Sequence, residues 1–109
     1  MKQIGVGLIG FGTVGAGVAD GLQRNRKVMA QRLGVDVVLK RIADVDIETD
    51  RGVTVDKSLL TTDALSVIND PEIHIVVELI GGTGVAKTFV LAALNAGKAV
   101  VTPSLPVFD

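Results

Sequence analysis

The sequence predicts an α/β protein with a doubly wound parallel sheet, in which helices cover both faces to give three layers. Apolar segments of strand length alternate with segments of helical periodicity along the chain, a pattern typical of parallel strands joined by right-handed crossovers. The expected strands are apolar at consecutive positions, as strands buried on both faces are. The 109 residues suffice for one domain with a single core.

The amino-terminal part is expected to form a strand, a helix and a second strand. Gln3 to Ile9 is a short apolar run rich in branched residues, which predicts a buried strand. Apolar residues then recur at helical spacing from Thr13 to Leu33. Within this helix Gly17 and Gly21 each cost up to ~1 kcal/mol relative to alanine, and we expect them to let the helix approach the sheet closely. Val35 to Ala43 predicts the second strand.

The remaining chain continues the alternation after a long polar segment. Residues 44–60 predict a loop with one short strand near its end. Thr62 is a suitable N-cap for a short helix that ends near Asn69. The last predicted elements are a strand over Ile73–Ile80, a helix over Val85–Ala96 and a strand that starts at Ala99–Val101.

Composition excludes several classes of protein. Hydrophobic residues make up 48% and charged residues 21%, which is a globular balance and not a disordered one. The net charge of −1 and the three aromatic residues, all Phe, give no reason to expect nucleic acid or an anionic membrane as a partner. Without cysteine and with one histidine, no metal site is predicted. No signal peptide or membrane span is recognisable, and we expect a cytoplasmic protein.

The stretch GFGTVG carries the first functional prediction. It has the GxGxxG pattern, directly after a predicted strand and at the start of a predicted helix. In this Rossmann-like context the first glycine allows a tight turn, the second lets a pyrophosphate approach the backbone, and the third lets the helix pack on the sheet. The alternative is a glycine-rich turn without a ligand. The expected cofactor contacts on the turn are Gly10, Phe11, Gly12, Thr13, Val14 and Gly15.

Asp44 is the second candidate, because it ends the second predicted strand. An acidic residue there binds the adenosine ribose hydroxyls and repels a 2′-phosphate, which favours NAD. The basic residues Lys40, Arg41, Arg51 and Lys57 lie nearby in the sequence and could accept that phosphate instead. Asp44 could also be a solvated turn residue. The cofactor is therefore expected to be NAD or NADP.

Other candidate residues follow the later strands. Gly81, Gly82 and Thr102 lie at carboxyl ends of predicted strands, which is where ligands bind to open parallel sheets. Glu78, inside an apolar strand, could be a catalytic acid, but the favoured interpretation is a carboxylate that is satisfied by neighbouring backbone or faces a strand edge. His74 lies at the opposite end of that strand and is expected to be structural or solvated. No residue is predicted to be catalytic.

Three further stretches carry a resemblance: LTTD at Leu60–Asp63, NDPEIHIVVELIGG at Asn69–Gly82, and AALNAGKAVVT at Ala92–Thr102. Together with the glycine motif they resemble the amino-terminal cofactor domain of homoserine dehydrogenase. The resemblance implies NAD(P)-dependent interconversion of homoserine and aspartate 4-semialdehyde, a step toward threonine, methionine and isoleucine. It also implies cofactor contacts on the glycine turn and at Gly81 and Gly82.

The chain departs from the family pattern after Thr102. The family continues with alanine, asparagine and a lysine important at the active site, whereas this chain reads Pro103, Ser104 and Leu105. The family's second domain, with its catalytic lysine and acidic residues, is also missing from the sequence. We therefore expect a cofactor domain at residues 1–102, an atypical tail at residues 103–109, and no catalysis by this chain alone.

Two other functions remain open at this stage. The first is the cofactor domain of another reductase, such as a relative of dihydrodipicolinate reductase. The second is a non-enzymatic module that senses a nucleotide or a redox ratio. An unpaired sheet edge would also make self-association a reasonable expectation.

Overall fold

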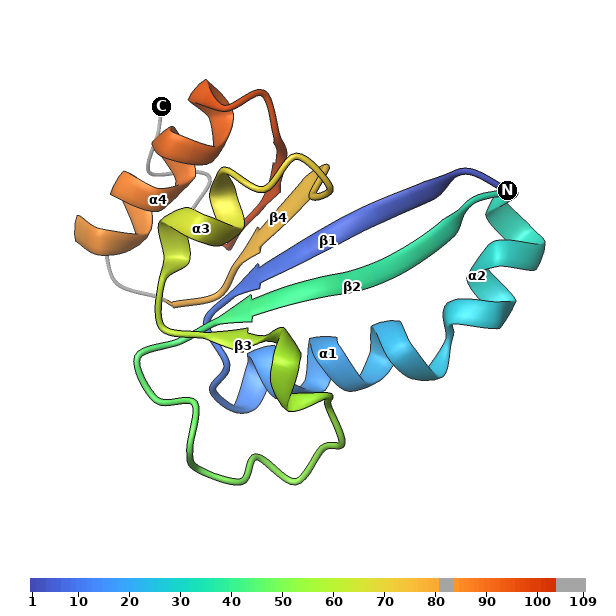
Figure 1. Cartoon of the computed structure of the whole chain (residues 1–109), viewed down its shortest axis with the longest axis horizontal. Coiled ribbons are helices and arrows are strands. Elements are labelled where there is room, and N and C mark those ends of the chain that lie inside the picture. Colours follow the sequence, from blue (N-terminus) through green and yellow to red (C-terminus); the bar gives the residue numbers. More distant parts are fainter. Residues whose placement is uncertain (81–83, 104–109) are drawn as a thin grey trace.

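The computed structural model describes residues 1–80 and 84–103, and it contains a five-stranded parallel sheet in the order β3-β2-β1-β4-β5 (Figure 1). β1 (Gln3–Ile9) is central, β2 (Asp36–Ala43) and β4 (Ile75–Glu78) flank it, and β3 (Leu60–Thr61) and β5 (Ala99–Val101) form the edges. The chain winds outward from β1 to one edge, returns, and winds to the other edge. This order confirms the predicted doubly wound sheet.

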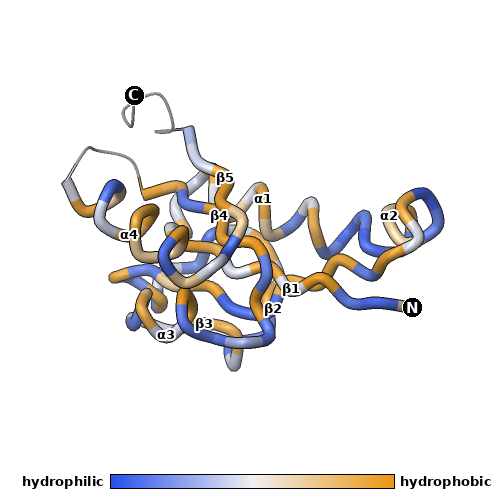
Figure 2. The backbone as a smooth tube through the Cα atoms, turned by 90° about the horizontal axis from the view of Figure 1, so that it is seen from above, coloured by the Kyte–Doolittle hydropathy of each residue, from blue (hydrophilic) through white to orange (hydrophobic). Residues whose placement is uncertain are grey.

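Helices cover both faces of the sheet, as the three-layer prediction requires. α1 (Thr13–Arg24) and α2 (Arg26–Leu33) follow β1, while α3 (Ala64–Ile68) and α4 (Gly84–Asn95) pack on the opposite face. Neighbouring residues of β1 show the division: Leu8 packs with α1, and Ile9 packs with α3 and α4. In Figure 2 the hydrophobic colour follows β4 and β5 through the centre of the molecule.

The helix predicted over residues 13–33 is in fact two helices, separated at Asn25. Asn25 has φ −100° and ψ 8°, and both its main-chain N–H and its side-chain Nδ2 donate to the carbonyl of Gly21, at 3.0 and 2.9 Å. An asparagine side chain that competes for backbone groups in this way interrupts a helix. The second helix ends at Gly34, which adopts the left-handed conformation with φ 73°.

The later elements differ from prediction mainly at their ends. Asp63, and not Thr62, caps α3, because its carboxylate accepts a hydrogen bond from the N–H of Ser66 at 3.3 Å. β4 is shorter than predicted and runs only over the residues that pair with β1 and β5. The polar loop has the predicted form, since it ends in a short 3₁₀ turn (Lys57–Leu59) followed by β3.

Neighbouring segments approach β1 so closely that two positions within the strand have room only for glycine. A methyl group built on Gly5 would lie 1.9 Å from the carbonyl oxygen of Glu72, and one on Gly7 would lie 2.5 Å from Cγ1 of Val67. By contrast, a methyl group on Gly17 or Gly21 would meet nothing within 4 Å. The expectation that these two helix glycines permit close packing is therefore wrong.

We predict that Gly5→Ala lowers the free energy of unfolding by at least ~2 kcal/mol, because main-chain atoms of the Glu72 segment must move to admit the methyl group. The matched control is Gly17→Ala, which adds a methyl group in open space on α1 and should raise stability by up to ~1 kcal/mol. Urea denaturation followed by circular dichroism measures both. Equal midpoints for the two variants would contradict the packing argument.

Candidate functional site

A cleft of about 680 Å³ opens at the carboxyl edge of the sheet, where the strand order reverses between β1 and β4. Such a switch point is where open α/β sheets bind their ligands. The residues that line the cleft come from the carboxyl ends of successive strands and from the helices that follow them: Ile9, Gly10, Gly12, Ala43, Asp44, Val45, Thr62, Asp63, Ala64, Leu65, Leu79, Ile80, Val85 and Phe89.

The three glycines of the motif differ in how closely other atoms surround them. Gly10 has φ +107°, and a methyl group there would lie 2.8 Å from the carbonyl carbon of Leu79. A methyl group on Gly15 would lie 2.1 Å from the oxygen of Gly10. Gly12 differs from both, because it is exposed, lines the cleft and has nothing within 4 Å of a Cβ position. The fold explains Gly10 and Gly15, and it leaves Gly12 unexplained.

The start of α1 faces the same opening. Gly12 is the N-cap in an extended conformation, without a side-chain capping bond, and no acidic residue lies in the first turn. The first helical hydrogen bond joins the N–H of Ala16 to the oxygen of Gly12 at 2.8 Å. The N–H groups of Thr13, Val14 and Gly15 precede that bond, and such groups together with the helix dipole favour an anion.

Phe11 contributes to the glycine turn through its backbone and not through its side chain. Its side chain is 4% exposed and belongs to the core under α1. Its N–H donates to Oδ2 of Asp44 at 2.6 Å. The N–H of Phe11 is therefore already bonded to the end of β2.

Asp44 links the end of β2 to the glycine turn. Its second oxygen, Oδ1, accepts from the N–H of Asp46 at 2.8 Å, while the N–H of Gly10 donates to the oxygen of Ala43 at 2.8 Å. The carboxylate is half-buried and lines the cleft. Asp44 is therefore an ordered residue in the wall of the cleft, and not simply a solvated turn residue.

The loop after Asp44 is held by Asp46. Hydrogen bonds from the Thr49 hydroxyl at 2.6 Å and from the N–H groups of Thr49 and Glu48 lower the pKa of Asp46 to about 2. Arg51 adds an ion pair to Asp46 at 3.2 Å. These contacts keep the loop folded upon itself.

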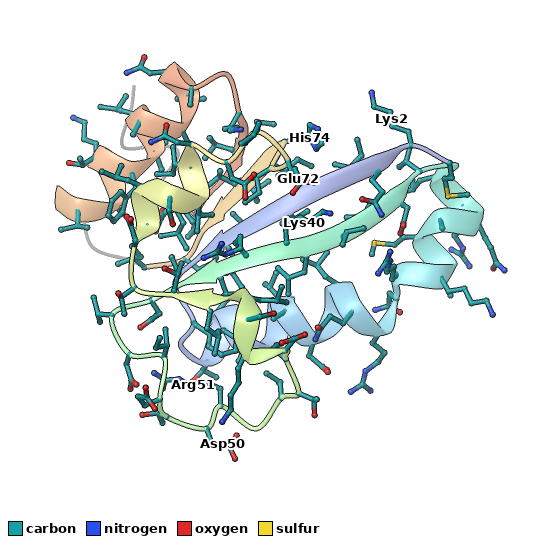
Figure 3. All side chains as sticks on the ribbon, viewed as in Figure 1. Lys2, Lys40, Asp50, Arg51, Glu72 and His74 are labelled. Atoms are coloured by element: carbon teal, nitrogen blue, oxygen red, sulfur yellow. The ribbon has the colours of Figure 1, made fainter. Side chains whose placement is uncertain are left out.

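The basic residues that lie near Asp44 in the sequence do not form one cluster in the structure. They are Lys40, Arg41, Arg51 and Lys57. Arg51 and Lys57 line a separate, smaller hollow of about 260 Å³ beside Phe11. Lys40 lies with Glu72 and His74, away from Arg51 on the loop, as Figure 3 shows. None of the four lines the larger cleft.

Glu78 is fully buried, and its carboxylate is satisfied locally. Oε2 accepts from the N–H of Ile80 at 2.7 Å, and Oε1 accepts from the hydroxyl of Thr102 at 2.5 Å. Neighbouring backbone thus satisfies one oxygen of Glu78, as expected, whereas the side chain of Thr102 satisfies the other. Thr102 thus reaches the β4 end, whereas Gly81 and Gly82 lie outside the described residues.

His74 has the structural role expected from the sequence. Its Nδ1 accepts a hydrogen bond from the N–H of Gly5 at 2.9 Å, just before the start of β4 and at the opposite end of that strand from the cleft. No group of three or more His, Cys, Asp or Glu in residues 1–80 and 84–103 is arranged to hold a metal ion. Within that same part of the chain, no helix is both long and apolar enough to cross a membrane.

Sequence reasoning missed the apolar walls of the cleft. These are formed by Val45, Ala64 and Leu65 on the β2–β3 side and by Val85 and Phe89 of α4. A flat apolar ring system fits such a surface. Position just after a strand, the signal that found Asp44, could have found Val45, but it does not reach Val85 and Phe89, which lie within α4.

The strand order, the glycine turn and the cleft define a dinucleotide-binding class of α/β domain. Within that class, the family model described as "Homoserine dehydrogenase, NAD binding domain" matches residues 10–108. The chain belongs to this family.

Similar proteins agree with that assignment. A homoserine dehydrogenase of Methylobacillus glycogenes is 49% identical over 94% of this chain, and one of Bacillus subtilis is 40% identical over 94%. A crystal structure of Staphylococcus aureus homoserine dehydrogenase superposes with a TM-score of 0.86 at 33% identity, over 93% of this chain and 26% of that one. That of Thiobacillus denitrificans gives 0.83 at 43% identity, over 94% and 23%. The chain spans about a quarter of the length of the curated relatives it matches.

We predict opposite tolerance at two glycines of the same motif. Gly15→Ala should lower the free energy of unfolding by at least ~2 kcal/mol, because the methyl group would meet the main chain of Gly10. Gly12→Ala should change it by no more than ~0.5 kcal/mol, because its conformation is open to any residue and its surroundings are empty. Urea denaturation measures both, and a large loss from Gly12→Ala would show that the fold itself needs this glycine.

Proposed function

We propose that this chain is the cofactor-binding domain of an NAD(P)-dependent homoserine dehydrogenase, an oxidoreductase that interconverts L-homoserine and L-aspartate 4-semialdehyde. One observation carries the proposal: Gly12 is left bare at the mouth of the cleft although the fold does not require a glycine there. A diphosphate that approaches the backbone supplies the missing reason. The family assignment and the relatives' names support homoserine dehydrogenase as the enzyme to which the domain belongs.

Each part of the cleft has a role in this proposal. The diphosphate lies against Gly12 and the first N–H groups of α1, where Thr13 and Val14 contribute main chain. The adenine lies between the apolar walls, and the carboxylate of Asp44 binds the adenosine ribose. Gly81 and Gly82 are proposed to border the nicotinamide half, and Thr102 is proposed to contribute to the site without contact with the cofactor. The bound cofactor supplies the hydride, and the protein positions it.

We propose that proton transfer in the complete enzyme depends on residues beyond this chain. The acidic residues that line the cleft are already engaged: Asp44 accepts from Phe11 and Asp46, and Asp63 caps α3. In this proposal both carboxylates hold the backbone around the cleft. The chain alone is therefore expected to bind cofactor without turnover. The complete enzyme is proposed to act in cytoplasmic amino-acid biosynthesis. Self-association through the edge strand β5 remains a prediction.

One neighbour favours a second candidate. An NAD-binding oxidoreductase of Klebsiella pneumoniae superposes with a TM-score of 0.73 at 25% identity over 92% of this chain. The same cleft could therefore serve a different reductase. The residues that would separate the two are those that contact the substrate, so activity of the full-length enzyme toward aspartate semialdehyde decides between them.

The proposal is tested by titrating the 109-residue chain with NADH and with NADPH, using the nicotinamide fluorescence. We expect Gly12→Val to weaken binding at least ~tenfold, because the side chain fills the place of the diphosphate. Gly17→Val, also an exposed glycine of this segment with open space around it, is the matched control and should bind as the original chain does. Unchanged affinity in Gly12→Val would refute the proposed site.

We further predict that Asp44 makes NADH the preferred cofactor. Its carboxylate lies at the proposed ribose position, and a 2′-phosphate there would meet a like charge. Asp44→Asn removes the charge while its amide oxygen can still accept from Phe11, and NADPH affinity should rise about tenfold relative to NADH. Asp50→Asn, on the same loop but outside the cleft, is the control. If the preference is the same in both variants, Asp44 does not set it.

A further inference from the structure

Glu78 is the one buried charged residue in the part of the chain that the structure describes, and the proposed cofactor site makes no use of it. It ends β4, opposite Ile9 of β1, and its side chain has no exposed surface. A buried carboxylate is costly unless hydrogen bonds compensate it. A leucine or valine would fill a strand position of this kind without that cost, so the carboxylate needs a reason.

The contacts of Glu78 join two strand ends. The last residue pair between β4 and β5 is Val77 with Val101, so Glu78 and Thr102 come one step beyond it. There the hydroxyl of Thr102 donates to Oε1 at 2.5 Å, while the N–H of Ile80 donates to Oε2 at 2.7 Å. The carboxylate thus continues the connection between the strands after their backbone pairing has ended.

The peptide between Leu79 and Ile80 also packs directly against the glycine turn. A methyl group on Gly10 would lie 2.8 Å from the carbonyl carbon of Leu79 and 2.9 Å from the nitrogen of Ile80. The N–H of Leu79 donates to the oxygen of Ile9 at 2.8 Å. Leu79 and Ile80 line the cleft, whereas Glu78 does not.

We propose that Glu78 is a positioning residue for the dinucleotide cleft. It fixes the Leu79–Ile80 peptide against Gly10, and Thr102 in turn fixes the carboxylate, so the end of β5 sets the spacing between the glycine turn and the cleft wall. Glu78 acts without touching the cofactor. The effect on binding rests on the proposed dinucleotide function, while the effect on the peptide does not.

The test uses the 109-residue chain and two measurements: the dissociation constants for NADH and NADPH, and hydrogen exchange of the Ile80 amide in the free chain. Thr102→Val removes the hydroxyl at nearly constant shape and should weaken binding and speed Ile80 exchange, each about tenfold. Thr102→Ser keeps the hydroxyl and should stay within about twofold of the original chain in both measurements. Thr88→Val is the control and should change neither, because it removes the hydroxyl of an exposed threonine of α4 that is bonded, among the described residues, only to Gly84 in the same helix.

A double-mutant cycle with Glu78→Gln shows whether Thr102 acts through the carboxylate. If it does, the combined variant loses clearly less affinity than the product of the two single losses, because both substitutions disturb one network. Independent, multiplying losses would mean that Thr102 acts on the cofactor directly, and would overturn the proposal. Weak binding by Thr102→Ser, equal to that of Thr102→Val, would overturn it as well.

The two proposals can fail separately. If the original chain binds neither NADH nor NADPH, the cofactor function of this chain fails, and exchange of the Ile80 amide decides the role of Glu78 by itself. Exchange that Thr102→Val leaves unchanged would overturn the positioning role even where cofactor binding is normal.

Discussion

The packing of the turn after β1 is the constraint on which the rest of the structure depends. Three neighbours close on this turn: α1 through Gly15, β2 through the N–H of Gly10, and β4 through the Leu79–Ile80 peptide. No side chain fits among them, so the backbone itself forms the floor of the cleft. Gly12, the residue that packing does not restrict, is then the one that faces the opening.

Two carboxylates hold the walls around this floor, and both do so by accepting main-chain N–H groups. Asp44 accepts from the turn itself, and Glu78 accepts from Ile80 on the other side. Hydrogen bonds of backbone donors to charged acceptors are stronger than those between neutral groups. These bonds therefore order two parts of the cleft wall, Asp44 beside the glycine turn and the Leu79–Ile80 peptide.

Family membership and geometry explain different parts of the function. The family model assigns the chain to the NAD binding domain of homoserine dehydrogenase, and the chain spans about a quarter of its relatives' length. The geometry indicates how a cofactor would be held, and it shows that Asp44 and Asp63 accept hydrogen bonds from nearby backbone. Under the proposed function, the domain contributes binding and orientation of the cofactor.

The sequence by itself determined whatever depends on short-range pattern. Gln3–Ile9 is a strand with the predicted bounds, and the glycine motif falls at the predicted junction of strand and helix, because periodicity and turn chemistry are local. The helix break at Asn25 was also local, but helical periodicity continues across it and hid the competing hydrogen bonds of its side chain.

Only the tertiary structure decided which glycine serves the fold and which faces the cleft, and which polar groups meet. Phe11 and Asp44 are 33 residues apart, and Glu78 and Thr102 are 24 apart. Such pairs are set by strand order and register, which bring distant strand ends to one edge of the sheet. Local sequence patterns contain no information about the distance between strand ends that are far apart in the chain. For that physical reason the sequence identified these residues as candidates but could not predict that they contact one another.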